Sequence, residues 1–243
     1  MDRARRCEIN LWMKERVVMS WSGGKDSAMA LQELLRAGAY EVVSLLTTVS
    51  EEYRRISHHG VRESLLDEQA NAIGLPLRKV YLPSGHGGCT NEVYESIMKE
   101  VMLEFRSDGV RTVVFGDLFL QDLRDWREAN LATVGMRGLF PIWDRDTAQF
   151  ARDAIALGYK AHLSCVEDRV GADFAGRQYD SKLLRDLPVE VDPCGENGEF
   201  HTFVYGAPIF RQPISVRVGE IVARDGRHYA DLISTRKPEP SRS

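Results

Sequence analysis

A short run of small, polar and charged residues near the N-terminus is the part of the sequence best suited to chemistry. Residues 22–27 follow an apolar run at 17–20 and precede a helical pattern at 26–37. Glycines let a backbone approach an anion closely, and a helix start offers unpaired N–H groups and the positive end of its dipole. The run also contains two serine hydroxyls, which can donate hydrogen bonds, and a lysine that we expect to be exposed and to bind a phosphate oxygen. Its aspartate can reach a metal ion. The sequence therefore predicts a polyphosphate-binding loop made of Ser22, Gly23, Gly24, Lys25, Asp26 and Ser27.

This loop does not follow the two best-known nucleotide-binding patterns. A Walker A loop needs a glycine five residues before Gly24, where Met19 stands, and Ser or Thr directly after Lys25, where Asp26 stands. The loop does not read G-x-G-x-x-G either. The plainest alternative is a serine-capped helix after a tight turn, with the lysine and the aspartate solvated.

Polar residues also stand where two further predicted strands end. Thr47 and Thr48 close the run at 42–49, and Gly116 and Asp117 close the run at 112–115, with Asp122 shortly after. Ligands of open α/β sheets bind outside the carboxyl ends of the strands. We expect the two threonines and the glycine to flank a nucleotide, and the two aspartates to contact the second substrate. The alternatives are ordinary strand threonines and surface acids at a helix start.

A second dense group of functional side chains lies near residue 200. Residues 192–204 read Asp-Pro-Cys-Gly-Glu-Asn-Gly-Glu-Phe-His-Thr-Phe-Val. Turn chemistry explains the proline, the glycines and the Asn-Gly pair, but not the remaining polar residues. A zinc site using Cys194 and His201 is one interpretation, although no paired ligand spacing supports it. The preferred prediction is a substrate-binding loop that includes Glu196, Asn197, Glu199, His201 and Thr202.

Two motifs together carry a family resemblance. Ser-Gly-Gly-Lys-Asp-Ser resembles the loop of the PP-loop ATP pyrophosphatase superfamily, and with Gly-Glu-Asn-Gly-Glu-Phe-His-Thr-Phe-Val the chain resembles the diphthine-ammonia ligase family over about residues 14–234. The resemblance implies a cytoplasmic ligase that uses ATP and Mg²⁺ to adenylate a carboxylate, releases pyrophosphate, and transfers ammonia. The implied acceptor is diphthine on elongation factor 2. The chain resembles the compact prokaryotic form, without the additional C-terminal domains expected of eukaryotic members.

The resemblance also suggests roles for individual residues. It implies that the loop at 22–27 binds ATP, that Lys25, Asp26, Glu199 and His201 serve catalysis, and that Asp26 contacts the metal. His59 is a further candidate for contact with nucleotide or substrate. The segment 54–62, rich in arginine and histidine, is more similar to bacterial relatives, for which another carboxylate acceptor is expected. A tRNA-modifying enzyme and a non-catalytic ATP sensor are the alternative functions.

The elements that must position these residues alternate regularly. β-branched runs and helical patterns predict five strand and helix units, with strands at 17–20, 42–49, 77–82, 112–115 and 139–143 and helices at 26–37, 61–73, 93–105, 124–135 and 147–158. Such alternation is typical of an α/β fold with a doubly wound parallel five-stranded sheet, here of the HUP-like Rossmann type that the resemblance implies. From about 159 the period falls towards two, and hairpin signals at Asn197-Gly198 and Asp225-Gly226 indicate an α+β lobe. The predicted units are an ATP-binding domain at 14–157, a substrate-binding lobe at 158–235 and a flexible tail at 236–243.

Composition limits the class of protein. The 243 residues carry 32 Lys and Arg against 36 Asp and Glu, so no overall positive charge favours nucleic acid. No continuous apolar segment is long enough for an ordinary membrane helix, and the N-terminus lacks the apolar core of a signal peptide. The four cysteines are far apart, which argues against disulfides and zinc knuckles. We expect a cytoplasmic protein without a membrane partner, and a homodimer is compatible with the sequence.

Overall fold

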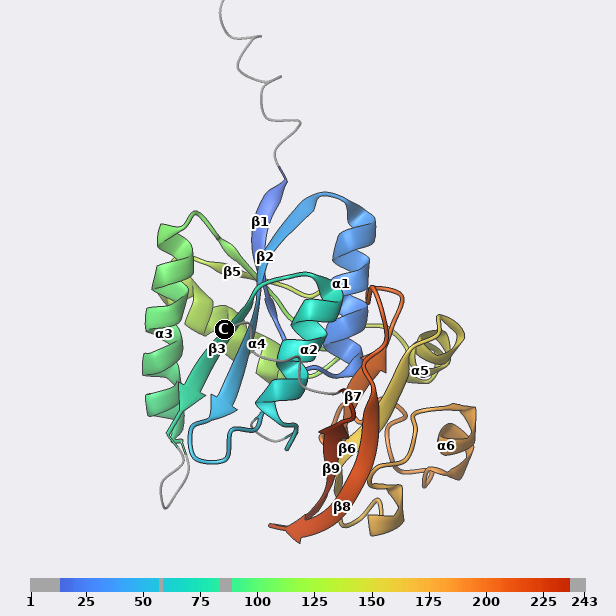
Figure 1. Ribbon diagram of the computed structural model, residues 1–243. Coiled ribbons are helices and arrows are strands. Elements are labelled where there is room, and N and C mark those ends of the chain that lie inside the picture. Colours follow the sequence, from blue (N-terminus) through green and yellow to red (C-terminus); the bar gives the residue numbers. More distant parts are fainter. Residues whose placement is uncertain (1–13, 57–58, 84–88, 237–243) are drawn as a thin grey trace, which may run out of the picture.

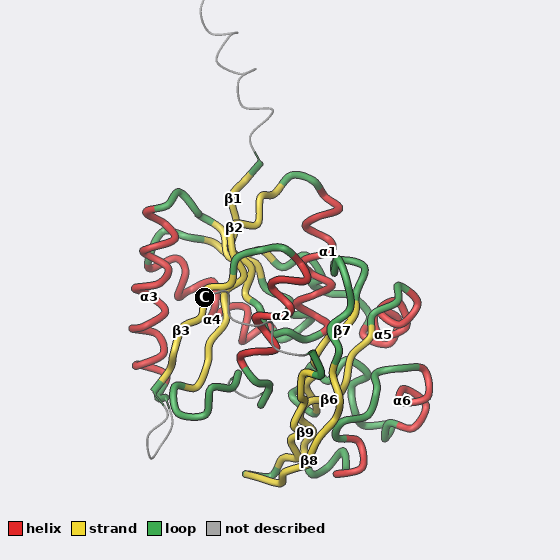
Figure 2. Tube along the Cα trace, in the orientation of Figure 1, coloured by secondary structure: helices red, strands yellow, loops and turns green. Residues whose placement is uncertain are grey.

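The structure, a computed structural model, describes residues 14–56, 59–83 and 89–236. Within these ranges the chain forms a parallel-sheet domain and a C-terminal lobe with a separate antiparallel sheet. Figure 1 shows the two sheets beside each other, and Figure 2 separates their strands from the surrounding helices.

The parallel sheet has five strands in the order β3-β2-β1-β4-β5, and every neighbouring pair is parallel. The strands are β1 (Glu15–Ser20), β2 (Tyr40–Ser50), β3 (Leu77–Leu82), β4 (Thr112–Val114) and β5 (Arg137–Leu139). β1 and β4 are adjacent in the sheet but separated in sequence by the two strands β2 and β3, so the sheet is doubly wound and its strand order reverses between β1 and β4. This confirms the predicted fold class and places the 22–27 loop at the expected position for a ligand site.

Helices cover both faces of this sheet. Figure 1 shows α1 (Lys25–Ala37) and α2 (Glu63–Ile73) on one side, and α3 (Asn91–Ser107) and α4 (Gln121–Thr133) on the other. The alternation of side chains along each strand produces two cores: Met19 of β1 belongs to the first, and Val18 belongs to the second. Helices α1 and α2 end at Gly38 and Gly74, whose left-handed backbones return an N–H to the last turn.

The C-terminal lobe has an antiparallel sheet in the order β7-β6-β9-β8. Its strands are β6 (Lys160–Glu167), β7 (Phe200–Gly206), β8 (Val216–Arg224) and β9 (Arg227–Ser234), accompanied by α5 (Thr147–Ala156), the 3₁₀ turn at Ala172–Phe174 and α6 (Ser181–Asp186). Buried residues of β6, β7 and α5 belong to the same core as those of α1 and α2. The lobe is therefore packed against the α1 side of the parallel-sheet domain.

Two local predictions were wrong. The fifth strand covers 137–139 and not 139–143, since it is held only by three pairs with β4, and residues 141–144 form a turn. Asp225-Gly226 does connect β8 to β9, but Asn197-Gly198 forms a turn inside the loop before β7, where the Gly198 N–H donates to Gly195 O over 3.1 Å. Residues 237–243 of the predicted tail lie outside the described residues. No helix in the described ranges is long and apolar enough to cross a membrane.

Candidate active site

The predicted phosphate loop connects β1 to the first turn of α1. Gly23 has a left-handed backbone with φ of 77°, and Gly24 caps the helix. The Ser22 and Ser27 hydroxyl oxygens lie 3.1 Å apart, and Ser27 Oγ donates to Gly24 O over 3.0 Å. The two hydroxyls thus sit together at the positive end of α1, an arrangement suited to binding an anion.

Lys25 is buried, contrary to the expectation of an exposed cation. Only 1% of it is accessible, and its Nζ donates to both carboxylate oxygens of Asp26 at 2.9 and 3.0 Å and to Cys194 O. The rings of Tyr179 and Phe200 lie 5.5 and 5.7 Å from the same nitrogen. Burial is the largest effect and opposes the charge of Lys25, but the charge and hydrogen bonds of Asp26, together with Cys194 and Glu196, offset it, so the pKa of Lys25 is raised. The ammonium group therefore joins α1 to the C-terminal lobe.

Asp26 is the one residue predicted to contact a metal. Its side chain is 26% exposed, and both of its oxygens accept from Lys25. Among the described residues, no group of three His, Cys, Asp or Glu side chains could hold a metal ion. A cation at Asp26 would therefore depend on ligands from elsewhere, and phosphate oxygens are the usual ones for Mg²⁺.

The loop before β7 is held together by its own acidic residues. Asp192 Oδ1 accepts the N–H groups of Cys194 and Glu196 at 2.8 and 3.3 Å. Glu199 is 1% exposed, and its Oε1 accepts from the Asp192 N–H at 3.1 Å and from Asn197 Nδ2 at 3.0 Å. Its Oε2 is buried without a hydrogen bond among the described residues. Glu199 and Asn197 thus shape the loop.

Cys194 is a packed thiol. Its Sγ donates to Thr147 O over 3.2 Å, and burial raises its pKa to about 12. A thiol with that pKa is protonated at neutral pH, which does not favour a role as a nucleophile.

Three residues of this loop and strand contact the parallel-sheet domain at separate points. Thr202 Oγ1 accepts the Lys25 N–H over 3.0 Å at the start of α1. Glu196 Oε1 accepts the Leu118 N–H over 2.7 Å, beyond the end of β4. The His201 ring stacks on the His59 ring, with centroids 4.2 Å apart, beyond the end of β2. The C-terminal signature therefore reaches three of the loops at the carboxyl end of the sheet.

The strand-end residues have different surroundings. Thr47 is buried, and its Oγ1 makes no hydrogen bond among the described residues, whereas Thr48 faces a cleft. A Cβ atom on Gly116 would lie 2.8 Å from the Asp26 and Ser27 backbone, so this glycine lets β4 end against the phosphate loop. Asp117 pairs with Arg127 over 2.8 Å. Asp122 is exposed in the first turn of α4.

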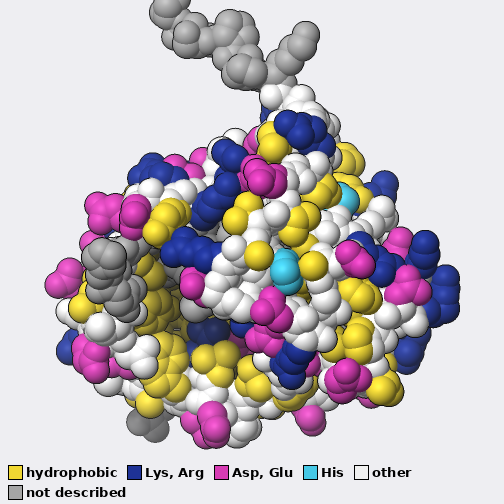
Figure 3. Space-filling view, turned by 90° about the horizontal axis from the view of Figure 1, so that it is seen from below, with side chains coloured by type: hydrophobic (Ala, Val, Ile, Leu, Met, Phe, Trp, Pro, Cys, Tyr) yellow, Lys and Arg dark blue, Asp and Glu magenta, His cyan; other side chains and the backbone are white. Residues whose placement is uncertain are grey.

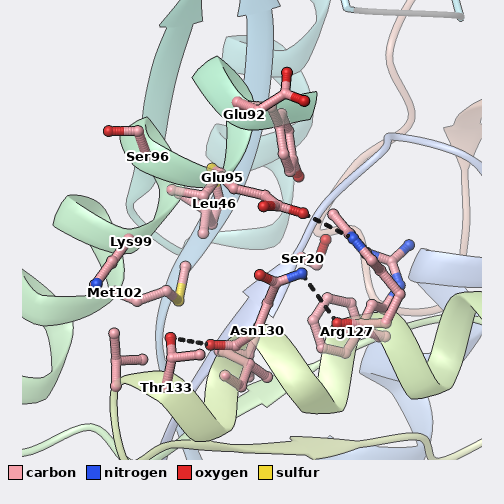
Figure 4. A pocket seen from close by; sticks show the side chains of 17 residues that line it. Ser20, Leu46, Glu92, Glu95, Ser96, Lys99, Met102, Arg127, Asn130 and Thr133 are labelled. Carbon is pink, nitrogen blue, oxygen red and sulfur yellow. Dashed lines mark hydrogen bonds between the residues drawn. The ribbon is translucent and has the colours of Figure 1, made fainter. Parts of the chain in front are cut away.

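Two neighbouring cavities open at this end of the sheet. One of about 440 Å³ lies between α3 and α4 above Ser20 and Leu46, and a wider one of about 920 Å³ reaches from Thr48 to β8 and β9. Figure 4 shows residues of α3 and α4 facing each other across the smaller cavity, and Figure 3 shows the hollowed end of the molecule with hydrophobic side chains inside it. Tyr94, Trp126 and Arg127 line both cavities.

Some residues that shape the site were missed in the sequence. Gln69 binds the phosphate loop, Asp192 organises the signature loop, and Tyr179 covers Lys25. Gln69 did leave a signal, because it is a polar residue on the apolar stripe that includes Leu66 and Ala70. Asp192 and Tyr179 left none, since their contacts are made across long sequence separations or by backbone groups.

Comparisons with known proteins match both halves of the chain. Residues 14–138 match a family described as diphthamide synthase N-terminal domain, and residues 146–235 match diphthamide synthase C-terminal domain. Proteins named diphthine--ammonia ligase are 28% identical in Danio rerio and 24% identical in Homo sapiens. Each alignment spans 89% of this chain, and 92% and 88% of those proteins. A Schizosaccharomyces pombe protein of the same name is 25% identical over 83% of this chain but only 36% of its own length.

The vertebrate relatives correct one expectation. Additional C-terminal domains do not distinguish eukaryotic members in general, because the vertebrate proteins are covered over nearly their full length and only the yeast relative is much longer. The fold, the two sequence motifs and the match over both domains lead to the same conclusion: the chain belongs to the diphthamide synthase family.

Proposed function

We propose that this protein is an ATP-dependent ligase that adenylates a substrate carboxylate and then transfers ammonia to it. The observation that carries the proposal is the joining of the phosphate loop to the C-terminal signature, where the Lys25 N–H donates to Thr202 Oγ1 and Lys25 Nζ donates to Cys194 O. Two cavities open at the same end of the sheet. The family and the names of the relatives support a ligase acting in diphthamide synthesis. The adenylation step is the part of the proposal that we add to this family-level activity.

ATP fits the nucleotide side of this site. We propose that its phosphates bind at Ser22, Gly23, Gly24 and Ser27, where hydroxyls and a helix start converge, with the base towards the cavity above Leu46. The unsatisfied Thr47 hydroxyl and the close approach at Gly116 flank this region. Lys25 acts there through its charge, since its ammonium group is hydrogen-bonded to Asp26 and Cys194. Mg²⁺ would be held by Asp26 with phosphate oxygens and would neutralise charge on the phosphates.

The acceptor side is the wider cleft. We propose that the carboxylate enters between the lobes, with His59, His201 and Glu196 nearest the phosphate loop and Asp117 beside Arg127. Asn197, Glu199 and Thr202 contribute by holding the loop and strand in place. Asp122 remains a proposed substrate contact only if the acceptor extends along α4.

The chemistry follows from the poor reactivity of a carboxylate. A carboxylate oxygen bonds to the α-phosphorus of ATP while the bond to pyrophosphate breaks. Ammonia then bonds to the acyl carbon, AMP leaves and the nitrogen loses a proton. No protein nucleophile is needed, so the residues act by positioning and by stabilising charge. For the acceptor, the relatives' names point to diphthine. The family resemblance implies that this diphthine is carried by elongation factor 2.

The decisive experiment measures AMP and pyrophosphate release from Mg-ATP and ammonium, with and without elongation factor 2 bearing diphthine. Amide formation with equimolar AMP supports the proposal. ATP binding without AMP release for this or any other carboxylate would instead identify an ATP sensor, and AMP release stimulated by tRNA would identify a tRNA-modifying enzyme. A matched His201→Phe variant keeps a ring beside His59 and should retain ATP binding while losing acceptor-dependent AMP release.

A further inference from the structure

Gln69, on α2, is fully buried and makes three hydrogen bonds to distant parts of the chain. Its Nε2 donates to Gly23 O over 2.9 Å and to Val204 O over 2.6 Å, and its Oε1 accepts from Trp21 Nε1 over 2.9 Å. Trp21 and Gly23 belong to the loop that carries the proposed phosphate site, and Val204 belongs to β7 of the C-terminal lobe. One amide group therefore connects three segments of the molecule.

One of these bonds holds the phosphate loop at Gly23, the residue with the left-handed backbone. The Gly23 carbonyl accepts both from Gln69 Nε2 and from the Val204 N–H, the latter over 2.9 Å. Gly23 has a left-handed backbone, and a Cβ atom there would lie 2.8 Å from Gln69 Oε1. The direction of this carbonyl sets the direction of the next peptide N–H, because the peptide unit is planar. The Gln69 amide thus fixes the direction of the Gly24 N–H, which donates to Ser22 Oγ over 3.2 Å within the phosphate loop.

We infer that Gln69 is a positioning residue for nucleotide binding, which holds the phosphate loop in its binding conformation and couples it to β7. The inference rests on the proposed use of ATP. The three hydrogen bonds at this position need a side chain with two N–H donors and one acceptor oxygen in one planar group, and an amide provides them. Methionine fills a similar volume but makes none of these bonds. Glutamate would place an oxygen between two carbonyl oxygens that now accept from an amide nitrogen.

A second buried glutamine provides a matched control. Gln32, on α1, is 4% exposed, and its Oε1 accepts from the Tyr159 hydroxyl over 2.9 Å. It also connects the two parts of the molecule, but it does not contact the phosphate loop. Gln32→Met and Gln69→Met therefore make the same chemical change at two buried sites, and only the second removes contacts to Gly23.

The test compares ATP affinity and the KM for ATP in the wild type, Gln69→Met, Gln69→Glu and Gln32→Met, with thermal unfolding measured in parallel. We expect Gln69→Met to raise the Kd for ATP about tenfold or more, since a loss of about 1.4 kcal/mol of binding free energy corresponds to a tenfold change. The KM for the acceptor should be unchanged. Gln69→Glu should weaken ATP binding further, whereas Gln32→Met should leave ATP affinity unchanged. A Trp21→Phe variant removes the bond to Oε1 and leaves a smaller ring in the same buried position, and its ATP affinity should lie between those of wild type and Gln69→Met.

The outcomes separate this inference from the proposed function. If the wild type binds no ATP, the proposed function fails, and the inference fails with it. If the wild type binds ATP and the Gln69 variants bind it equally well, the inference alone is overturned. Equal losses of ATP affinity in Gln69→Met and Gln32→Met would also overturn it, because they would reflect general destabilisation. If the Gln69 variants do not fold, Trp21→Phe decides: unchanged ATP affinity in that variant would count against the inference.

Discussion

The role of a single residue depends here on its burial as much as on its type. Lys25 is one of the two charged residues of the phosphate loop, yet it is enclosed by Tyr179, Phe200 and the Cys194 carbonyl. An enclosed ammonium group is stable only with its partners in place, since an unpaired buried charge is costly. The same side chain therefore joins the two parts of the molecule, in addition to supplying the charge that we propose for nucleotide binding.

This burial predicts a cost in stability for Lys25→Ala. We expect the free energy of unfolding to fall by about 3 kcal/mol, the lower end of the range for a broken buried ion pair, because the Asp26 carboxylate keeps some contact with solvent. Urea unfolding measures the effect. Lys182→Ala, which removes an exposed lysine on α6, is the control and should change stability by less than about 0.5 kcal/mol. Equal stability of Lys25→Ala and wild type would show that the ammonium group is not held in its buried contacts with Asp26 and the Cys194 carbonyl.

Glu196 predicts a dependence of stability on pH. Burial, with the nearby charge of Asp26, raises its pKa from 4.5 to about 7. The folded protein therefore binds a proton that the unfolded chain has released between these values. The contribution of Glu196 to stability is fully present below pH 4.5 and is lost as the pH rises through about 7.

A neutral side chain at this position should remove that dependence. Glu196→Gln keeps an oxygen for the Leu118 N–H. Relative to wild type, we expect the variant to gain about 1–3 kcal/mol between pH 4.5 and pH 8. Urea unfolding across this range, with exposed Glu190→Gln as control, provides the measurement. Parallel pH profiles for wild type and Glu196→Gln would contradict the assigned burial.

At the scale of elements, the site is made where strand β4 and strand β7 both approach the start of α1. β7 supplies the Thr202 hydroxyl and the Val204 N–H, and β4 ends at Gly116 against the Asp26–Ser27 peptide. These contacts leave no room for a side chain at residue 116. The geometry of the phosphate loop thus depends on two strands that lie far from it in sequence.

Gly116→Ala should push these elements apart. Its new Cβ would lie 2.8 Å from backbone atoms that cannot rotate away, so we expect a loss of about 1–3 kcal/mol in stability and a marked loss of ATP affinity. Thermal unfolding and ATP titration measure the two effects. Gly206→Ala is the control, because its Cβ would meet only Lys160 side-chain atoms at 3.5 Å or more. Normal ATP binding by Gly116→Ala would show that the β4 end is not part of the nucleotide site.

At the scale of the whole molecule, the two sheets are also joined on the far side of the cleft. Asp231 of β9 accepts from Arg55 Nη2 at 2.8 Å and from Arg62 Nε and Nη2 at 2.9 and 2.8 Å. Both arginines lie between β2 and α2. Hydrogen bonds from Arg62, with those from Arg55, lower the pKa of Asp231 to about 2. The parallel-sheet domain and the C-terminal lobe are thus bridged both at the phosphate loop and at this ion-pair cluster.

Asp231→Asn should weaken the second connection. A lowered pKa means that the stabilising contribution is present above pH 3.8 and is lost as the pH falls through about 2. At pH 7 we expect a loss of about 1–2 kcal/mol, since both arginines are partly exposed. Chemical unfolding at neutral pH tests this, with Asp225→Asn, an 80% exposed partner of Arg224, as control. A loss equal to that of Asp225→Asn would mean that the cluster does not hold the lobe.

Local patterns were enough to predict the doubly wound sheet, the β-rich lobe and the loop at 22–27. Helices, strands and turns leave patterns of apolar residues and glycines within a short stretch of chain, so a single sequence is enough to detect them. Motif resemblance added the family, which the two domain matches confirm. The same patterns did not give the correct bounds of short elements such as β5, whose three residues form a strand because they pair with β4.

Only folding decided which functional residues meet. The burial of Lys25 under the C-terminal lobe, the stacking of His59 on His201 and the Gln69 bonds to Gly23 and Val204 all join segments at least 46 residues apart. No local pattern encodes such contacts, because they depend on the packing of β7 against α1 and α2. Asp122, equally suited by type and position along the chain, was left on an exposed helix face for the same reason.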